Sequence, residues 1–197
     1  MRIHLDSEAN GLLQKSDTGE AADRIWCAVF NQEDGKVWRF YEGADAGGYN
    51  GKLSEIKDFI MSCPEDEFVC HNLFGFDLEL FRRILGIQYG LDWWVCPTNR
   101  IRFTDTLDRS QSQWPDRPHP KGCPYVIPNS VTGKNKRVGP HGLEAWGYRV
   151  ANAKPVVHDW RNGEIEDYLH RCEEDTIITR ETHIYLDNEM ERNKLRG

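Results

Sequence analysis

The order of apolar and polar positions predicts strands in the first part of the chain. Residues 2–6 form a short apolar run, and the runs 24–31 and 36–42 are rich in aromatic and β-branched residues. Asp34 and Gly35 lie between the second and third runs, and Asp-Gly in that position is a strong hairpin signal. We therefore expect three consecutive strands in an antiparallel meander.

Farther along the chain, apolar residues recur at helical spacing between shorter strand-like runs. Within 52–63, which Pro64 ends, four residues share one helical face: Leu53, Ile56, Phe59 and Ile60. The later elements are a strand at 67–71, a helix at 77–85 closed by Gly86, a strand at 102–106, a helix at 141–150 and a long helix from Glu164. This order is typical of an α/β sandwich with a mixed sheet, and we expect a single domain over 1–197.

Residues 110–140 interrupt this alternation. They hold six of the nine prolines, and we expect a long irregular insertion of the kind that is usually functional or mobile. Three basic side chains in it are candidates for phosphate contacts: Lys134, Lys136 and Arg137. So short a basic run is more often just a solvated loop.

Composition limits the class of protein. Of 197 residues, 39% are hydrophobic and 11% aromatic, which is enough for a core and too aromatic for a disordered chain. No apolar run approaches the roughly 18 residues of a membrane span, and charge appears too early for a signal peptide, so we expect a cytoplasmic protein without membrane contacts. The net charge of -7 excludes nucleic-acid binding by bulk positive field alone. The six cysteines include no Cys-x-x-Cys pair, so we expect free thiols.

Carboxylates in three separated segments are the candidate chemistry. Asp6 and Glu8 alternate on one face at the end of the first expected strand, so both point the same way. Two like charges side by side destabilise a protein unless a cation lies between them. Asp77 begins a helix and, taken alone, is equally well explained as a helix cap. Asp175 precedes an apolar run that should draw the last helix against the sheet.

The chain carries three short motifs in order: Asp6-x-Glu8, His71-Asn72 followed by Asp77, and His170 followed by Asp175. Together they resemble the three motifs of the DnaQ-like (DEDD) 3′–5′ exonucleases. The stretches 6–13, 104–107 and 141–149 are also similar to the proofreading domain of family A DNA polymerases from short-tailed phages. The resemblance covers nearly the whole chain. It implies a ribonuclease H-like fold, with a mixed five-stranded sheet flanked by helices.

The resemblance implies a metal-dependent nuclease acting on single-stranded or frayed DNA 3′ ends. By the motif match, four carboxylates bind two divalent cations: Asp6, Glu8, Asp77 and Asp175. Ligation by oxygen alone suits Mg²⁺ or Mn²⁺, one ion generating the attacking hydroxide and the other stabilising the departing 3′ oxygen. The expected substrate contacts are Ser7 and Ala9 through their backbone, Asn72, and Phe76 as a stacking face. Core packing explains Phe76 at least as well.

The general base is where the sequence departs from its resemblance to the phage domains. Those domains place a Tyr four residues before the last Asp, where this chain has Arg171, which cannot accept a proton. The other branch of the family uses a His five residues before, and His170 has that spacing. Because five residues rotate a helix by about 140°, His170 requires an irregular turn before Asp175. Tyr168 shares the face of Asp175 but lies about 10 Å up the axis.

Three functions follow as alternatives. The first is a 3′–5′ DNA exonuclease that releases nucleoside monophosphates, with proofreading beside a separate polymerase chain as one role. The second keeps the chemistry on RNA or short oligonucleotides and differs in contacts to the 2′-OH. The third is a catalytically inactive DNA-binding accessory subunit, motivated by Arg171, and the intact set of four carboxylates argues against it.

Overall fold

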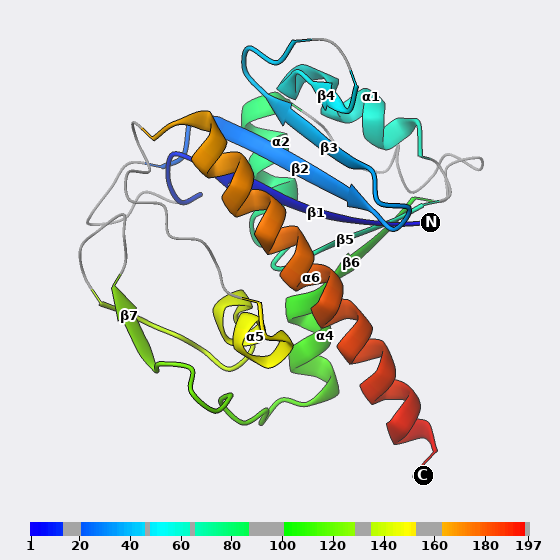
Figure 1. The fold of residues 1–197 in the computed structure, drawn as a ribbon, viewed down its shortest axis with the longest axis vertical. Coiled ribbons are helices and arrows are strands. Elements are labelled where there is room, and N and C mark those ends of the chain that lie inside the picture. The colour runs from blue at the N-terminus through cyan, green and yellow to red at the C-terminus, as the bar shows by residue number, and fades with distance from the viewer. Residues whose placement is uncertain are drawn as a thin grey trace.

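A mixed sheet flanked by helices forms the centre of the protein (Figure 1). The computed structural model describes residues 1–13, 21–45, 48–63, 66–86, 101–128, 135–152 and 163–195. The strands of the sheet are β1 (Arg2–Ala9), β2 (Ile25–Gln32), β3 (Val37–Tyr41), β4 (Asn50–Gly51), β5 (Glu67–Cys70) and β6 (Arg102–Asp105). The helices are η1 (Leu53–Glu55), α1 (Ile56–Met61), α2 (Asp77–Leu85), α4 (Thr106–Gln113), α5 (Leu143–Val150) and α6 (Ile165–Lys194). The predicted α/β class is confirmed.

The strand order is β4-β3-β2-β1-β5-β6. As predicted, β1, β2 and β3 form an antiparallel meander, and β5 and β6 continue the sheet in parallel with β1. The predicted count of five strands was wrong, because β4 adds a sixth that pairs with β3. This strand has only two residues, too few to give a periodic signal. Gly51 is required there, since a Cβ would lie 2.8 Å from the ring of Phe40.

The two faces of the sheet pack against different helices. Ile3 and Leu5 of β1 point to one face, where they join a core that includes residues of α1 and α2. On the other face Cys27 and Val29 of β2 pack against Tyr168 of α6. Figure 1 shows α6 crossing β1 and β2 on this face. Successive side chains along β1 and β2 therefore point alternately to the apolar core and to the face that α6 covers.

The segment 110–140 is less irregular than expected. Asp105 ends β6 and caps α4 by accepting hydrogen bonds from the backbone of Leu107 and Asp108, and the helix continues to Gln113. Farther on, β7 (Val126–Pro128) and β8 (Asn135–Arg137) form a separate two-stranded sheet. Residues 129–134, which include the candidate Lys134, lie outside the described residues, and Lys136 and Arg137 are exposed.

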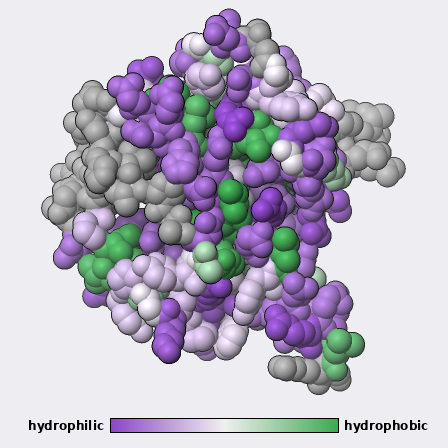
Figure 2. Space-filling model, in the orientation of Figure 1, coloured by the Kyte–Doolittle hydropathy of each residue, from purple (hydrophilic) through white to green (hydrophobic). Residues whose placement is uncertain are grey.

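The visible surface is mostly hydrophilic. Figure 2 shows apolar side chains in small separate groups, one of them over β7, where Val126 is 47% exposed. Small groups of this kind are ordinary on protein surfaces. Among the described residues, none of the helices combines the length and apolar character needed to cross a membrane. The five cysteines in the described part of the chain are free, as predicted.

Candidate metal centre

Four acidic side chains from three elements meet beside the end of β1. The ligand atoms of Asp6, Glu8 and Asp175 all lie within 4.8 Å of one another, and so do those of Asp6, Cys70 and Asp77. Asp6 belongs to both groups and joins them. The sequence motifs are therefore brought together, and each group could hold a metal ion.

Strand pairing explains why Asp6 and Glu8 point toward α6. Asp6 lies opposite Val29, and Glu8 lies opposite Cys27, in the antiparallel pair β1–β2. Directly opposed residues share a face, and the face of Val29 and Cys27 is the one that packs against α6. Cys172 of α6 donates its thiol hydrogen to the backbone oxygen of Asp6 over 3.0 Å. This hydrogen bond holds α6 against the site. It agrees with the prediction that the apolar residues after Asp175 draw the last helix against the sheet.

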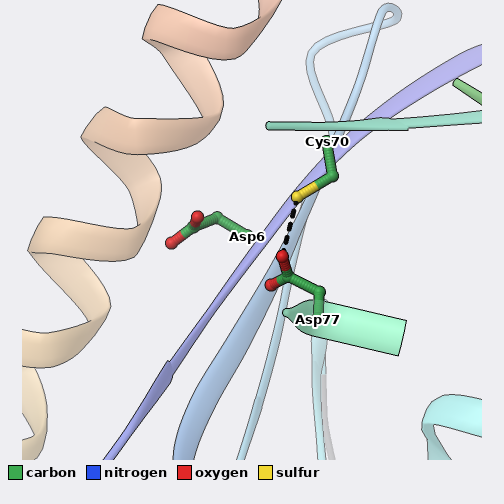
Figure 3. Close-up of side chains that lie close together, drawn as sticks. All are labelled: Asp6, Cys70 and Asp77. Carbon is green, nitrogen blue, oxygen red and sulfur yellow. Dashed lines mark hydrogen bonds between the residues drawn. The ribbon is translucent and has the colours of Figure 1, made fainter. Parts of the chain in front are cut away.

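Asp77 enters the site from the N-terminus of α2. Its side chain is buried, and it accepts hydrogen bonds from Ser7 Oγ at 2.5 Å and from Cys70 Sγ at 3.1 Å. Figure 3 shows Cys70 and Asp77 directed at each other, with the carboxylate of Asp6 directed toward α6. Helix capping does not explain Asp77, because Phe76 is the N-cap residue of α2. Burial raises the pKa of Asp77 to about 6, although the hydrogen bonds from Ser7 and Cys70 favour the charged form.

Asp105, which no sequence motif singled out as a site residue, holds the loop before α2. Its carboxylate accepts hydrogen bonds from the backbone of Asn72 at 2.9 Å and of Phe74 at 3.3 Å. The loop is tightly folded: Asn72 has a φ of 66°, and a Cβ on Gly75 would lie 2.3 Å from the Asn72 side chain. Asp105 belongs to the stretch 104–107, but only the tertiary structure shows that it faces this loop.

Arg171 brings a positive charge into the acidic cluster. Its Nε lies 3.1 Å from Asp175 Oδ2 and 3.7 Å from Glu8 Oε1. Burial disfavours its charge, but the carboxylates of Asp175 and Glu8 outweigh burial and raise the pKa of Arg171. Arg171, which cannot act as a base, therefore lies among the carboxylates.

The two candidate bases lie in different surroundings on α6. The irregular turn that His170 requires was a wrong prediction, because α6 is regular from Ile165 to Lys194. His170 is exposed, whereas Asp175, about 140° around the helix, is buried. Tyr168 is buried and stacks on Trp26, with ring centroids 5.2 Å apart. Its hydroxyl accepts a hydrogen bond from the backbone of Gly163.

The predicted substrate contacts differ in exposure. Ser7 and Ala9 are buried, and the side chain of Ser7 is engaged with Asp77. Asn72 is half-buried. Phe76 packs against the hydrophobic core. The structure therefore supports core packing for Phe76 and not the stacking face. Phe74, in the same loop, is 49% exposed.

No model of a known protein family matches the chain, and no curated protein matches it either. The resemblance to DnaQ-like exonucleases therefore stays a prediction. What the structure adds to it is the convergence of the motif carboxylates around Asp6.

Proposed function

We propose that the chain is a metal-dependent 3′–5′ exonuclease with a ribonuclease H-like fold. It would hydrolyse the terminal phosphodiester of single-stranded or frayed DNA and release nucleoside monophosphates. One observation carries the proposal: Asp6 is shared by two groups of potential metal ligands that come from distant segments of the chain. Clustered carboxylates repel one another, and the guanidinium of Arg171 offsets only part of their charge, which favours a cation-dependent role for them.

The donor set fits hard divalent cations. Asp6, Glu8, Asp77 and Asp175 offer carboxylate oxygens, the ligands that Mg²⁺ and Mn²⁺ prefer. Because Asp6 belongs to both groups, these residues could hold a pair of ions. Divalent cations bound there would supply an activated water and neutralise the charge that develops at the phosphate.

Neighbouring residues orient these carboxylates. Ser7 and Cys70 each donate to one oxygen of Asp77, which fixes the rotation of its carboxylate. Burial raises the pKa of the Cys70 thiol well above its usual range, so the thiol stays protonated and can donate. Asp105 holds the loop that carries Asn72, and it thereby positions this amide for contact with a sugar-phosphate. Supporting hydrogen bonds of this kind are worth about 10- to 100-fold in metal affinity or activity.

Digestion of a 5′-labelled single-stranded DNA oligonucleotide by the purified chain tests the proposal. We expect Mg²⁺-dependent shortening from the 3′ end to mononucleotides, and no shortening in EDTA. Asp6→Asn should reduce the rate by more than about 100-fold, since even supporting residues cost up to that much. Asp34→Asn removes an exposed carboxylate in the β2–β3 turn and should leave the rate unchanged. Equal rates for Asp6→Asn and Asp34→Asn would refute the assignment.

The position of Arg171 favours a second candidate, a DNA-binding accessory subunit without turnover. Its guanidinium neutralises part of the cluster and cannot act as a base. This candidate predicts binding of single-stranded DNA with no metal-dependent shortening, beside a separate polymerase chain or alone. A matched RNA oligonucleotide in the same assay distinguishes DNA from RNA as the substrate.

A further inference from the structure

The two groups of ligands share Asp6 and differ in what contacts their other carboxylates. The Arg171 side chain, 17% exposed, lies within ion-pair distance of both Glu8 and Asp175, which are 13% and 5% exposed. Asp77 instead accepts hydrogen bonds from the neutral side chains of Ser7 and Cys70. One half of the candidate centre thus holds a cation supplied by the chain.

Helix geometry and chemistry both keep this cation in place. Arg171 precedes Asp175 by four residues on regular α6, the spacing at which side chains on a helix meet. Glu8 approaches from β1 on the face that α6 covers. A guanidinium stays protonated at any working pH and can donate to two carboxylates at once. Glu8 and Asp175 therefore share a positive charge before any ion arrives.

We propose that Arg171 is the resting occupant of the Glu8–Asp175 half of the centre. The first divalent cation binds between Asp6 and Asp77, and a second binds only by displacing the guanidinium of Arg171. The inference rests on the proposed metal site and deepens it. It makes the two ions unequal, because the second must break the ion pairs of Arg171 with Glu8 and Asp175.

A displaced guanidinium needs a new anionic partner. Its planar fork of donors matches a phosphate as well as a carboxylate. A nucleic-acid 3′ end supplies a phosphate beside the same carboxylates, so the substrate would favour the state in which the second ion has replaced Arg171. By linkage, nucleic acid should then tighten the second ion. Arg171 acts in this account as a positioning residue that couples ion loading to substrate.

Titration of the full chain with Mn²⁺ alone, with free Mn²⁺ followed by electron paramagnetic resonance, tests the proposal. Wild type should bind one ion tightly and a second weakly. Arg171→Gln should tighten the second ion about tenfold or more, within the usual range of coupling between sites. Arg171→Lys keeps the charge and should stay near wild type. Arg39→Gln is the matched control, because Arg39 pairs with Glu173 on the same helix outside the four carboxylates.

The outcomes separate this inference from the proposed function. If wild type and Arg171→Gln bind the second ion equally, or if Arg39→Gln tightens it as much, the role of Arg171 is refuted and the metal site stands. If none of the four proteins binds Mn²⁺, both proposals fail.

Thermal unfolding gives a second readout should Arg171→Gln be unstable without metal. Saturating Mn²⁺ should raise the Tm of Arg171→Gln more than that of wild type, because the ion replaces the missing charge. An equal rise in both proteins would overturn the inference.

Discussion

Replacing His4 by phenylalanine should remove a large part of the pH dependence of stability below pH 7. His4 lies on β1, facing α6, and is 1% exposed. Its ring centroid lies 5.9 Å from that of His183 on α6. Burial, with the charges of His183, Arg180 and Arg2, lowers the pKa of His4 to about 3.

The sign and size of the effect follow from proton uptake. Between pH 7 and pH 5 the unfolded chain binds a proton at His4, for which the reference pKa is 6.5, whereas the folded protein does not. One pKa unit corresponds to about 1.36 kcal/mol, so the interval from pH 6.5 to pH 5 lowers the free energy of unfolding by about 2 kcal/mol. For a protein of this length, that is roughly 4–8 °C in Tm. The His4→Phe variant should not show this decrease in the free energy of unfolding.

Urea unfolding at pH 7, 6 and 5, followed by tryptophan fluorescence, measures the difference. Asp77 has a raised pKa and contributes with the opposite sign, since its stability cost disappears as it is protonated below about pH 6. It is present in both proteins and cancels when they are compared. His170→Phe removes an exposed histidine and should follow wild type. If wild type and His4→Phe lose equal stability between pH 7 and pH 5, His4 is not buried as a neutral ring.

Three further predictions concern single contacts. Ser7→Ala removes a buried hydrogen bond to Asp77 and should weaken Mn²⁺ binding about 10- to 100-fold, whereas Ser62→Ala, at an exposed serine, should not. Gly75→Ala places a Cβ 2.3 Å from the Asn72 side chain, so oligonucleotide digestion should slow while Tm changes little; an unchanged rate would contradict the proposed role of this loop. Arg117→Met removes a buried guanidinium, leaves the partly buried Glu189 without its bidentate partner, and should cost about 3–5 kcal/mol in urea unfolding. Combining it with Glu189→Leu should restore most of this loss.

Local signals predicted most of the elements that support the site. The hairpin of β2 and β3 follows from Asp34-Gly35, and α2 begins and ends where its periodicity and Gly86 predict. Gly86 adopts a φ of 65°, as a glycine that closes a helix should. The strand β4 could not be predicted, because two residues paired by tertiary contacts leave no pattern in the sequence.

The sequence predicts those parts of the candidate site that depend on the alternation of side chains along a strand. It does not predict the parts that depend on tertiary packing. The period of β1 predicts that Asp6 and Glu8 share a face, and their register with β2 agrees. Cys70 and Asp105 reach the site only because β5 and β6 pair in parallel next to β1. The expected turn at His170 was wrong because the spacing of a family motif does not bend a helix, and α6 instead turns Arg171 toward the cluster.

Diffraction from a crystal soaked in Mn²⁺, with the anomalous signal used to locate the metal, tests the central claim most directly. We expect an ion whose ligands include carboxylate oxygens of both Asp6 and Asp77, close to the thiol of Cys70. Ions found only at other carboxylates, with Asp6 and Asp77 bound to none, would contradict it.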